Sequence, residues 1–180
     1  MSLIRPCRDD ERDAILAIVN AAAEAYRGVI PADRWHDPYM SRDELDAEIA
    51  AGVAFWGCEA DAVLAGVMGI QHVGDVELIR HAYVLPARQG EGVGTSLLRH
   101  LRALSGRRML VGTWAAAGSA IRFYERNGFA LVSEAEKTML LRRYWTIPER
   151  QIEASVVLAA NRGQTPNESE TEVQRPPFGV

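Results

Sequence analysis

The chain has 180 residues, of which 48% are hydrophobic and 24% are charged, and its formal net charge is −4. This balance predicts a globular domain with a substantial apolar core. The acidic charge argues against a nucleic-acid-binding protein, and no apolar run approaches the roughly 20 residues of a membrane helix. The first residues contain no apolar signal segment. Two cysteines, Cys7 and Cys58, are too few and too far apart for a disulfide framework or a zinc motif, so we expect a cytoplasmic protein without a metal.

The first 52 residues predict a strand and two helices. Residues 3–8 resemble a short strand, and an irregular aromatic loop is expected at residues 27–40. Ser41 and Glu44 have the spacing of a capping box at the start of a short second helix, which ends at Gly52. The first helix is predicted from apolar side chains that recur at helical spacing: Ile15, Ile18, Val19, Ala22 and Tyr26.

The middle of the chain predicts an antiparallel meander of three strands followed by an amphipathic helix. The strand-like runs cover residues 53–59, 62–72 and 76–84, with turn residues between them. The helix starts near Gly92. Its expected buried stripe consists of Val93, Leu97, Leu98, Leu101 and Leu104.

The remaining elements predict a single α+β domain at residues 1–162, followed by a flexible or loosely docked tail at residues 163–180. The expected architecture is a mixed, mostly antiparallel central sheet flanked by helices, in the order β-α-α-β-β-β-α-β-α-β-β. A helix is the favoured structure for the ambiguous segment 134–145. The other expected elements are strands at 108–114, 129–132 and 152–160 and a helix at 119–126.

A glycine-rich loop is the most informative stretch of the sequence. Gly90, Gly92 and Gly94 lie between the end of a predicted strand and the start of the amphipathic helix. Glycines allow close backbone approach, and the unpaired N–H groups of a first helical turn suit a phosphate or pyrophosphate. A dinucleotide-binding fingerprint fails because Leu97 occupies the third glycine position, and a P-loop fails because the loop has no lysine. A nucleotide-binding oxidoreductase is therefore disfavoured.

The loop resembles the acyl-CoA-binding segment of the GNAT superfamily of N-acetyltransferases. The family pattern Gln/Arg-x-x-Gly-x-Gly/Ala matches residues 89–94, Gln-Gly-Glu-Gly-Val-Gly. A second family segment matches residues 120–129, Ala-Ile-Arg-Phe-Tyr-Glu-Arg-Asn-Gly-Phe, and the opening Leu-Ile-Arg-Pro at residues 3–6 agrees as well. The resemblance covers residues 3–160 and implies a GNAT fold.

The same resemblance implies that acetyl-CoA is a cosubstrate. Backbone N–H groups of the loop would hold the pyrophosphate, and the strand before the loop would pair with the pantetheine arm. Ordinary strand packing is the alternative for the side chains of Tyr83 and Val84, and Arg88 is either a phosphate contact or a solvated surface arginine. The implied cofactor-binding residues are Tyr83, Val84, Gln89, Gly90, Glu91, Gly92, Val93, Gly94, Thr95 and Ser119.

Tyr124 matches the family tyrosine that can protonate the departing thiolate, and a core aromatic is its alternative role. Glu77 is the nearest candidate for the base, and His81 is a second one, expected on the same face of the strand. The family often has an asparagine where this chain has Ala117. Ser119 could replace its hydrogen bond, or could simply be a helix N-cap.

Aromatic residues in and beside the 27–40 loop suit an acceptor site, because that loop walls the acceptor site in this family. The implied substrate-binding residues are Tyr26, Trp35, His36 and His81, although packing of the loop against the sheet is an equal alternative for Trp35. The leading hypothesis is acetyl transfer to a small-molecule amine or a peptide by direct attack. The rival hypothesis is a non-catalytic GNAT-fold module that binds CoA or an effector. A homodimer is possible within either hypothesis.

Overall fold

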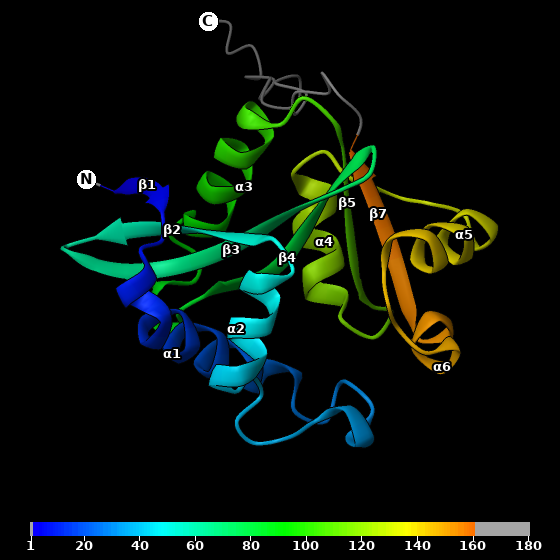
Figure 1. The fold of residues 1–180 in the computed structure, drawn as a ribbon, viewed down its shortest axis with the longest axis horizontal. Helices are drawn as coiled ribbons and strands as arrows, with labels where there is room; N and C mark the ends of the chain where they lie inside the picture. Colours follow the sequence, from blue (N-terminus) through cyan, green and yellow to red (C-terminus); the bar gives the residue numbers. More distant parts are fainter. Residues whose placement is uncertain (1, 161–180) are drawn as a thin grey trace, which may run out of the picture.

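A seven-stranded sheet forms the centre of the computed structural model, which describes residues 2–160 (Figure 1). The strand order is β1-β2-β3-β4-β5-β7-β6, and every neighbouring pair is antiparallel except β4 and β5. This confirms the predicted mixed, mostly antiparallel sheet. The strands are β1 (Leu3–Pro6), β2 (Val53–Ala60), β3 (Val63–Val73), β4 (Val76–Val84), β5 (Arg108–Trp114), β6 (Ala130–Leu131) and β7 (Ser155–Ala160).

Helices cover both faces of the sheet (Figure 1). On one face, α1 (Arg12–Ala23) and α2 (Arg42–Ala50) pack against the N-terminal half of the sheet, and α5 (Glu134–Tyr144) and α6 (Glu149–Glu153) pack against the C-terminal half. On the other face, α3 (Val93–Leu104) and α4 (Gly118–Arg126) share one core with β3, β4, β5 and β7. The short 3-10 turn η3 (Ala32–Arg34) lies in the loop between α1 and α2.

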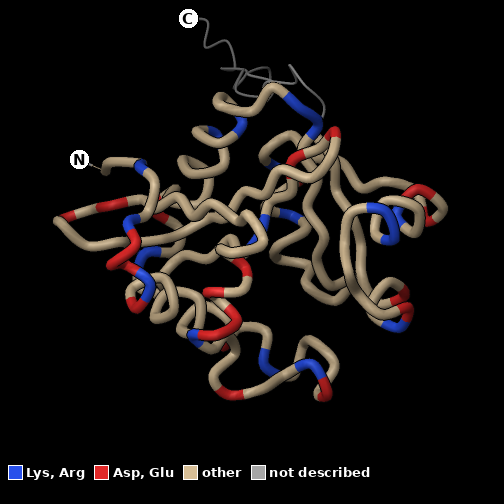
Figure 2. The backbone as a smooth tube through the Cα atoms, viewed as in Figure 1, with Lys and Arg blue, Asp and Glu red and all other residues tan. Residues whose placement is uncertain are grey.

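Ion pairs join α1 to α2 on the outside of the molecule. Figure 2 shows acidic and basic residues intermixed over these helices. Arg12 Nε lies 3.0 Å from Asp46 Oδ1, and Arg42 Nη1 lies 2.7 Å from Asp13 Oδ1. The predicted capping box is confirmed, because the Ser41 hydroxyl accepts from the Glu44 N–H while the Glu44 carboxylate accepts from the Ser41 N–H.

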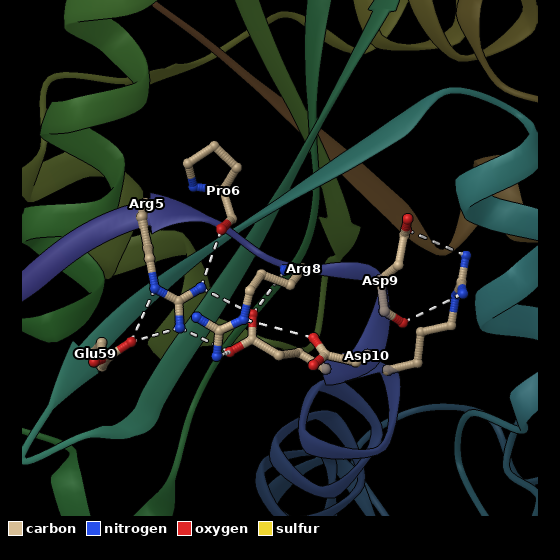
Figure 3. Close-up of polar contacts among 8 residues, drawn as sticks. Arg5, Pro6, Arg8, Asp9, Asp10 and Glu59 are labelled. Atoms are coloured by element: carbon tan, nitrogen blue, oxygen red, sulfur yellow. Dashed lines mark hydrogen bonds and ion pairs between the residues drawn. The ribbon is translucent and has the colours of Figure 1, made fainter.

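A second ion-pair cluster fastens the N-terminal strand (Figure 3). Arg5 in β1 donates to Glu59 in β2 at 2.9 Å and to Glu11 at 2.7 Å. Glu11 belongs to the short turn η1 (Asp9–Glu11) and also accepts the backbone N–H of Arg8 at 2.7 Å. These bonds, the Arg5 bonds first, lower the pKa of Glu11 to about 2.

Three sequence-based expectations for the fold are wrong. Leu104 belongs to α3 but is 59% exposed, so it lies outside the buried stripe. Ile152 lies in α6 and not in the last strand, which begins at Ser155. The expected element order placed no helix between the last two strands, but α5 and α6 both lie there; α5 confirms the helix favoured for residues 134–145. In the sheet, β7 inserts between β5 and β6. The predicted tail at residues 163–180 lies outside the described residues.

Candidate active site

A β-bulge in β4 opens the sheet where the site lies. Val67 in β3 pairs with Tyr83 and Gly69 pairs with Arg80, so His81 and Ala82 together oppose one residue of β3. His81 has a φ of 49°, a left-handed conformation that is uncommon for a residue other than glycine. The parallel ladder between β4 and β5 ends at the pair Ile79 and Val111. Beyond that pair, no strand within residues 2–160 pairs with the edge of β4 that faces β5.

A cavity of about 530 Å³ occupies this opening on the α3 and α4 side. Its walls come from β4, the glycine loop, the start of α3, β5 and α4. Nine of the ten residues predicted to bind the cofactor line it: Tyr83, Val84, Gln89, Gly90, Gly92, Val93, Gly94, Thr95 and Ser119. Glu91 does not line this cavity, and its carboxylate instead pairs with Arg88 at 2.9 Å.

The glycine loop presents free backbone donors to the cavity. Gly90 and Gly92 have φ values of 83° and 81°, and a side chain at either position would meet no atom within 4 Å. The first hydrogen bond of α3 runs from Ser96 N–H to the Gly92 carbonyl at 2.9 Å. The N–H groups of residues 93–95 therefore have no partner within the helix and lie at its positive end. This arrangement suits an anion.

Side-chain and backbone contacts hold the loop in place. The Gln89 amide donates to the Val84 carbonyl at 3.2 Å, and the Leu85 N–H donates to the Ala65 carbonyl at 2.9 Å. A methyl group at Gly94 would lie 3.3 Å from the Phe123 ring, so this glycine lets α3 approach α4 closely.

Tyr124 on α4 lines the same cavity although its side chain is only 5% exposed. Its ring packs against Phe123 and Phe129 at centroid distances of 5.0 and 5.5 Å. Burial, with a smaller contribution from Tyr26, raises the pKa of Tyr124. No group within residues 2–160 makes a hydrogen bond to its hydroxyl. The phenol therefore keeps its proton and has it available for a ligand.

Two arginines bring positive charge to this cavity, and sequence reasoning missed one of them. Arg88 lines it and also pairs with Glu91. Arg126 at the end of α4 lines it as well, and no carboxylate within the described part of the chain forms an ion pair with it. The spacing of Ser119, Phe123 and Arg126 places them on one helical face, so the sequence contained a signal for Arg126.

A second cavity, of about 230 Å³, lies on the opposite side of the sheet. It shares six lining residues with the first: Tyr26, Ile79, His81, Tyr83, Gly112 and Thr113. Five aromatic side chains contribute to its walls, next to polar residues such as Thr113, Gln151 and Ser155: Tyr26, Tyr39, Tyr83, Trp114 and Trp145. Two openings that share walls can hold two reactants side by side.

His81 lines both cavities, whereas Glu77 lines neither. Glu77 pairs in register with Met109 and therefore faces the α3 and α4 core. The bulge turns His81 to the other face, where its ring stacks on Phe55 at 6.0 Å and Nε2 lies 3.1 Å from Glu48 Oε2 of α2. The expectation that Glu77 and His81 share a face is wrong, because regular alternation along the strand ends at the bulge.

The predicted acceptor residues divide into two groups. Tyr26 and His81 line the second cavity, but Trp35 and His36 line neither cavity. Trp35 packs against Tyr39 at 5.4 Å and lies under the Arg27 guanidinium, and His36 contacts the Pro38 carbonyl and Glu44. These contacts pack the loop, which is the alternative role considered for Trp35.

Ser119 lies in the first turn of α4, whose N-cap is Ala117. Ser119 is therefore not a helix cap, and its side chain belongs to the cavity wall.

Among residues 2–160, no group of three or more His, Cys, Asp or Glu side chains is arranged to hold a metal ion. No helix within the same range has the length and hydropathy required to cross a membrane.

Comparison with known proteins agrees with this geometry. Residues 51–131, which include the glycine loop and α4, match the model of a family described as acetyltransferase (GNAT) domain. No curated protein sequence matches the chain significantly. This part of the chain is therefore similar in sequence to a GNAT acetyltransferase domain.

Solved structures of acetyltransferases share the fold. The PaiA N-acetyltransferase from Thermoplasma acidophilum in complex with coenzyme A has a TM-score of 0.69 at 16% identity, covering 89% of this chain and 99% of that one. The ribosomal-protein-S18-alanine N-acetyltransferase from Escherichia coli has a TM-score of 0.65 at 16% identity, covering 93% and 98%. N-acetylglutamate synthase from Neisseria gonorrhoeae, complexed with coenzyme A and N-acetyl-glutamate, has a TM-score of 0.62 at 22% identity, covering 91% and 36%. The seven-stranded sheet is thus the predicted GNAT fold.

Proposed function

We propose that this protein transfers an acetyl group from acetyl-CoA to a primary amine by direct attack, with both reactants bound at once. One observation carries the proposal. The glycine loop with its free N–H groups and the Tyr124 phenol line one cavity, and that cavity shares its walls with a second one. Such an arrangement places a thioester and an amine next to each other and next to a proton donor.

The first cavity fits acetyl-CoA in its chemistry. The N–H groups of residues 93–95 and the positive end of α3 suit the pyrophosphate, and Gly90 and Gly92 leave the approach open. Arg88 and Arg126 add positive charge beside them. The unpaired edge of β4 near Tyr83 offers backbone groups to the amides of the pantetheine arm. The coenzyme A in two of the structural neighbours supports this assignment.

Acetyl-CoA supplies an activated thioester. Because its pKa is raised, the Tyr124 hydroxyl stays protonated at neutral pH. That proton can pass to the leaving sulfur. Overall, one ammonium and one thioester give one amide, one thiol and one free proton. The protein must therefore also accept a proton from the incoming ammonium, and His81 is the base candidate that the walls of both cavities contain. Glu77, which lines neither cavity, is not proposed for this role.

The second cavity is the proposed acceptor site. Its volume of about 230 Å³ suits a small amine or the amino end of a peptide, and its aromatic walls suit an apolar body. The charge of Arg80, which also lines it, is balanced by Glu48 at 2.8 Å. A primary amine whose remaining body is aromatic or aliphatic and carries no further charge therefore fits this site better than a polyamine or a dicarboxylate does. A cytoplasmic location and a homodimer stay predictions.

A turnover experiment tests the proposal. The purified protein is incubated with acetyl-CoA and a panel of aromatic amines, aliphatic amines and short peptides, while free thiol and acceptor mass are followed. We expect thiol release that matches the gain of one acetyl group on an apolar amine. If acetyl-CoA binds but no amine of the panel is acetylated, the non-catalytic CoA-binding module is the better description.

A further inference from the structure

The carboxylate of Glu48 in α2 contacts the His81 imidazole. Because of the bulge in β4, two consecutive residues, Arg80 and His81, both contact Glu48. Arg80 Nη2 lies 2.9 Å from Glu48 Oε1, and His81 Nε2 lies 3.1 Å from Glu48 Oε2. Solvent reaches neither Glu48 Oε2 nor His81 Nε2, and their contact is close in distance but lacks the geometry of a hydrogen bond. The imidazole is thus held between this carboxylate and the Phe55 ring on which it stacks.

The Glu48 carboxylate remains ionised in this position. Burial opposes its ionisation, but the close contact with His81 and the charge of Arg80 outweigh that effect, so the pKa of Glu48 lies below its usual value. Apart from His81, the titratable groups that line the two cavities are phenols and arginines: Tyr26, Tyr39, Tyr83, Tyr124, Arg80, Arg88 and Arg126. Burial raises the pKa of Tyr26, Tyr83 and Tyr124. Glu48 is therefore the negative charge that meets the imidazole.

The contact determines which imidazole nitrogen carries the proton. Nε2 lies 3.1 Å from Glu48 Oε2, and a carboxylate has no hydrogen to donate, so a lone pair on Nε2 would face the negative charge directly. A proton on Nε2 removes that repulsion, so we expect neutral His81 to carry its proton there. The lone pair then lies on Nδ1. No described residue makes a hydrogen bond to Nδ1, so this atom is available to an acceptor amine.

We propose that Glu48 is a positioning residue that holds His81 in the tautomer whose Nδ1 takes a proton from the acceptor ammonium. The inference rests on the proposed function, since it concerns the proton that acetyl transfer must remove. In this step the N–H bond of the ammonium breaks and an Nδ1–H bond forms. The amine keeps the electron pair for attack, and the protonated imidazole later releases its proton to solvent.

The first test is spectroscopic and needs no acceptor. Long-range proton–nitrogen NMR correlations distinguish the two neutral imidazole tautomers at about pH 8, where an ordinary histidine is neutral. The His81 signals are assigned by their loss in His81→Gln. We expect the Nε2–H tautomer in the native protein. In Glu48→Gln, we expect Arg80 to donate to the new amide oxygen, so that the amide NH2 group faces His81 Nε2. Nε2 must then accept a hydrogen bond, so the imidazole proton should move to Nδ1.

The matched control is Glu44→Gln. Glu44 lies one turn earlier on α2 and contacts a different histidine, with Glu44 Oε1 3.3 Å from His36 Nε2. This variant should leave the His81 signals unchanged. An Nδ1–H tautomer in the native protein, or the same tautomer in native and Glu48→Gln proteins, would overturn the inference even if the enzyme acetylates amines.

The second test is a double-mutant cycle with an amine that the native protein acetylates. Glu48→Gln should lower kcat on the order of 10²-fold while KM for acetyl-CoA stays within twofold, because a proton-transfer group acts on the chemical step (about 10²–10⁴-fold). In a His81→Ala background the same change should have no further effect. Equal losses in both backgrounds would assign Glu48 a merely structural role. A native protein without turnover contradicts the proposed function but leaves the tautomer result intact.

Discussion

Arg150 and Asp33, which are 117 positions apart in the sequence, meet at 2.9 Å and join α6 to the loop between α1 and α2. Asp33 lies in η3, in the same loop as Tyr39, and Arg150 directly precedes Gln151 in α6; Tyr39 and Gln151 both line the second cavity. Both side chains are largely exposed, and exposed ion pairs contribute about 0–1 kcal/mol. The pair can therefore break and re-form as an acceptor enters.

Removal of this pair should loosen the loop without unfolding the protein. In Asp33→Asn we expect hydrogen exchange of residues 27–40 to increase by up to about fivefold, which corresponds to 1 kcal/mol, while exchange in β3 and β4 stays unchanged. The charge-reversed pair, Asp33→Arg with Arg150→Asp, should restore the native rates. Identical exchange in native and Asp33→Asn proteins would show that the pair does not restrain the loop.

The phenol of Tyr124 should act on catalysis and not on folding or cofactor affinity. In Tyr124→Phe the ring still packs against Phe123 and Phe129, and no hydrogen bond within residues 2–160 is lost. We expect an unchanged melting temperature, acetyl-CoA affinity within twofold of native, and kcat lower on the order of 10²-fold. Thermal unfolding, calorimetry and thiol release measure the three quantities. A variant with native kcat would exclude Tyr124 as the acid.

Arg126 should contribute charge to acetyl-CoA binding. Arg126→Ala should weaken the affinity about fivefold at low salt, and this difference should shrink as salt rises, because exposed charges are screened. Arg122 is the matched control, since it lies one turn earlier on α4, is also exposed and does not line the cavity. Equal effects of Arg122→Ala and Arg126→Ala would indicate only a general influence of net charge.

Acid should weaken the N-terminal cluster around Glu11. Its pKa of about 2 in the folded protein is below its ordinary value of 4.5, so the ionised carboxylate stabilises the fold above about pH 4.5. That contribution, on the order of 2 kcal/mol, is lost as the pH falls from about 4.5 toward about 2. Glu11→Gln should therefore be less stable than native at pH 7, and the difference should shrink over that range. Urea titrations at several pH values measure it.

Glu24→Gln serves as the control for this prediction, because Glu24 pairs with Arg27 on the exposed surface. Its effect at pH 7 should be much smaller. A Glu11→Gln protein whose stability loss is the same at pH 3 and pH 7 would contradict the assigned pKa.

The sequence predicts the fold well where local signals and tertiary packing agree. The capping box at Ser41, the meander and the glycine loop all lie where the pattern places them. The errors have a different origin. Ile152 has strand propensity, but α6 buries it against the C-terminal core, so packing overrides propensity.

The candidate site was predictable in its cofactor half and much less so in its acceptor half. Residues 89–95 are contiguous in sequence, so one motif identifies nearly the whole loop. The alternation of polar and apolar residues along β4 does not indicate the bulge at His81, and the bulge reverses the face of the sheet on which His81 lies. Glu48 reaches His81 from a helix more than 30 positions earlier, a contact that only the folded chain creates.

The most direct measurement is a calorimetric titration with acetyl-CoA of the native protein, Gly92→Glu and Gly52→Glu. Both glycines have positive φ and open space around them, so the two variants strain the backbone alike, but only Gly92 lines the first cavity. We predict that the native protein and Gly52→Glu bind acetyl-CoA with similar affinity, and that Gly92→Glu, whose carboxylate lies at the anion site, does not bind it measurably. Binding by Gly92→Glu at native affinity, or no binding by the native protein, would contradict the assignment of this loop to acetyl-CoA.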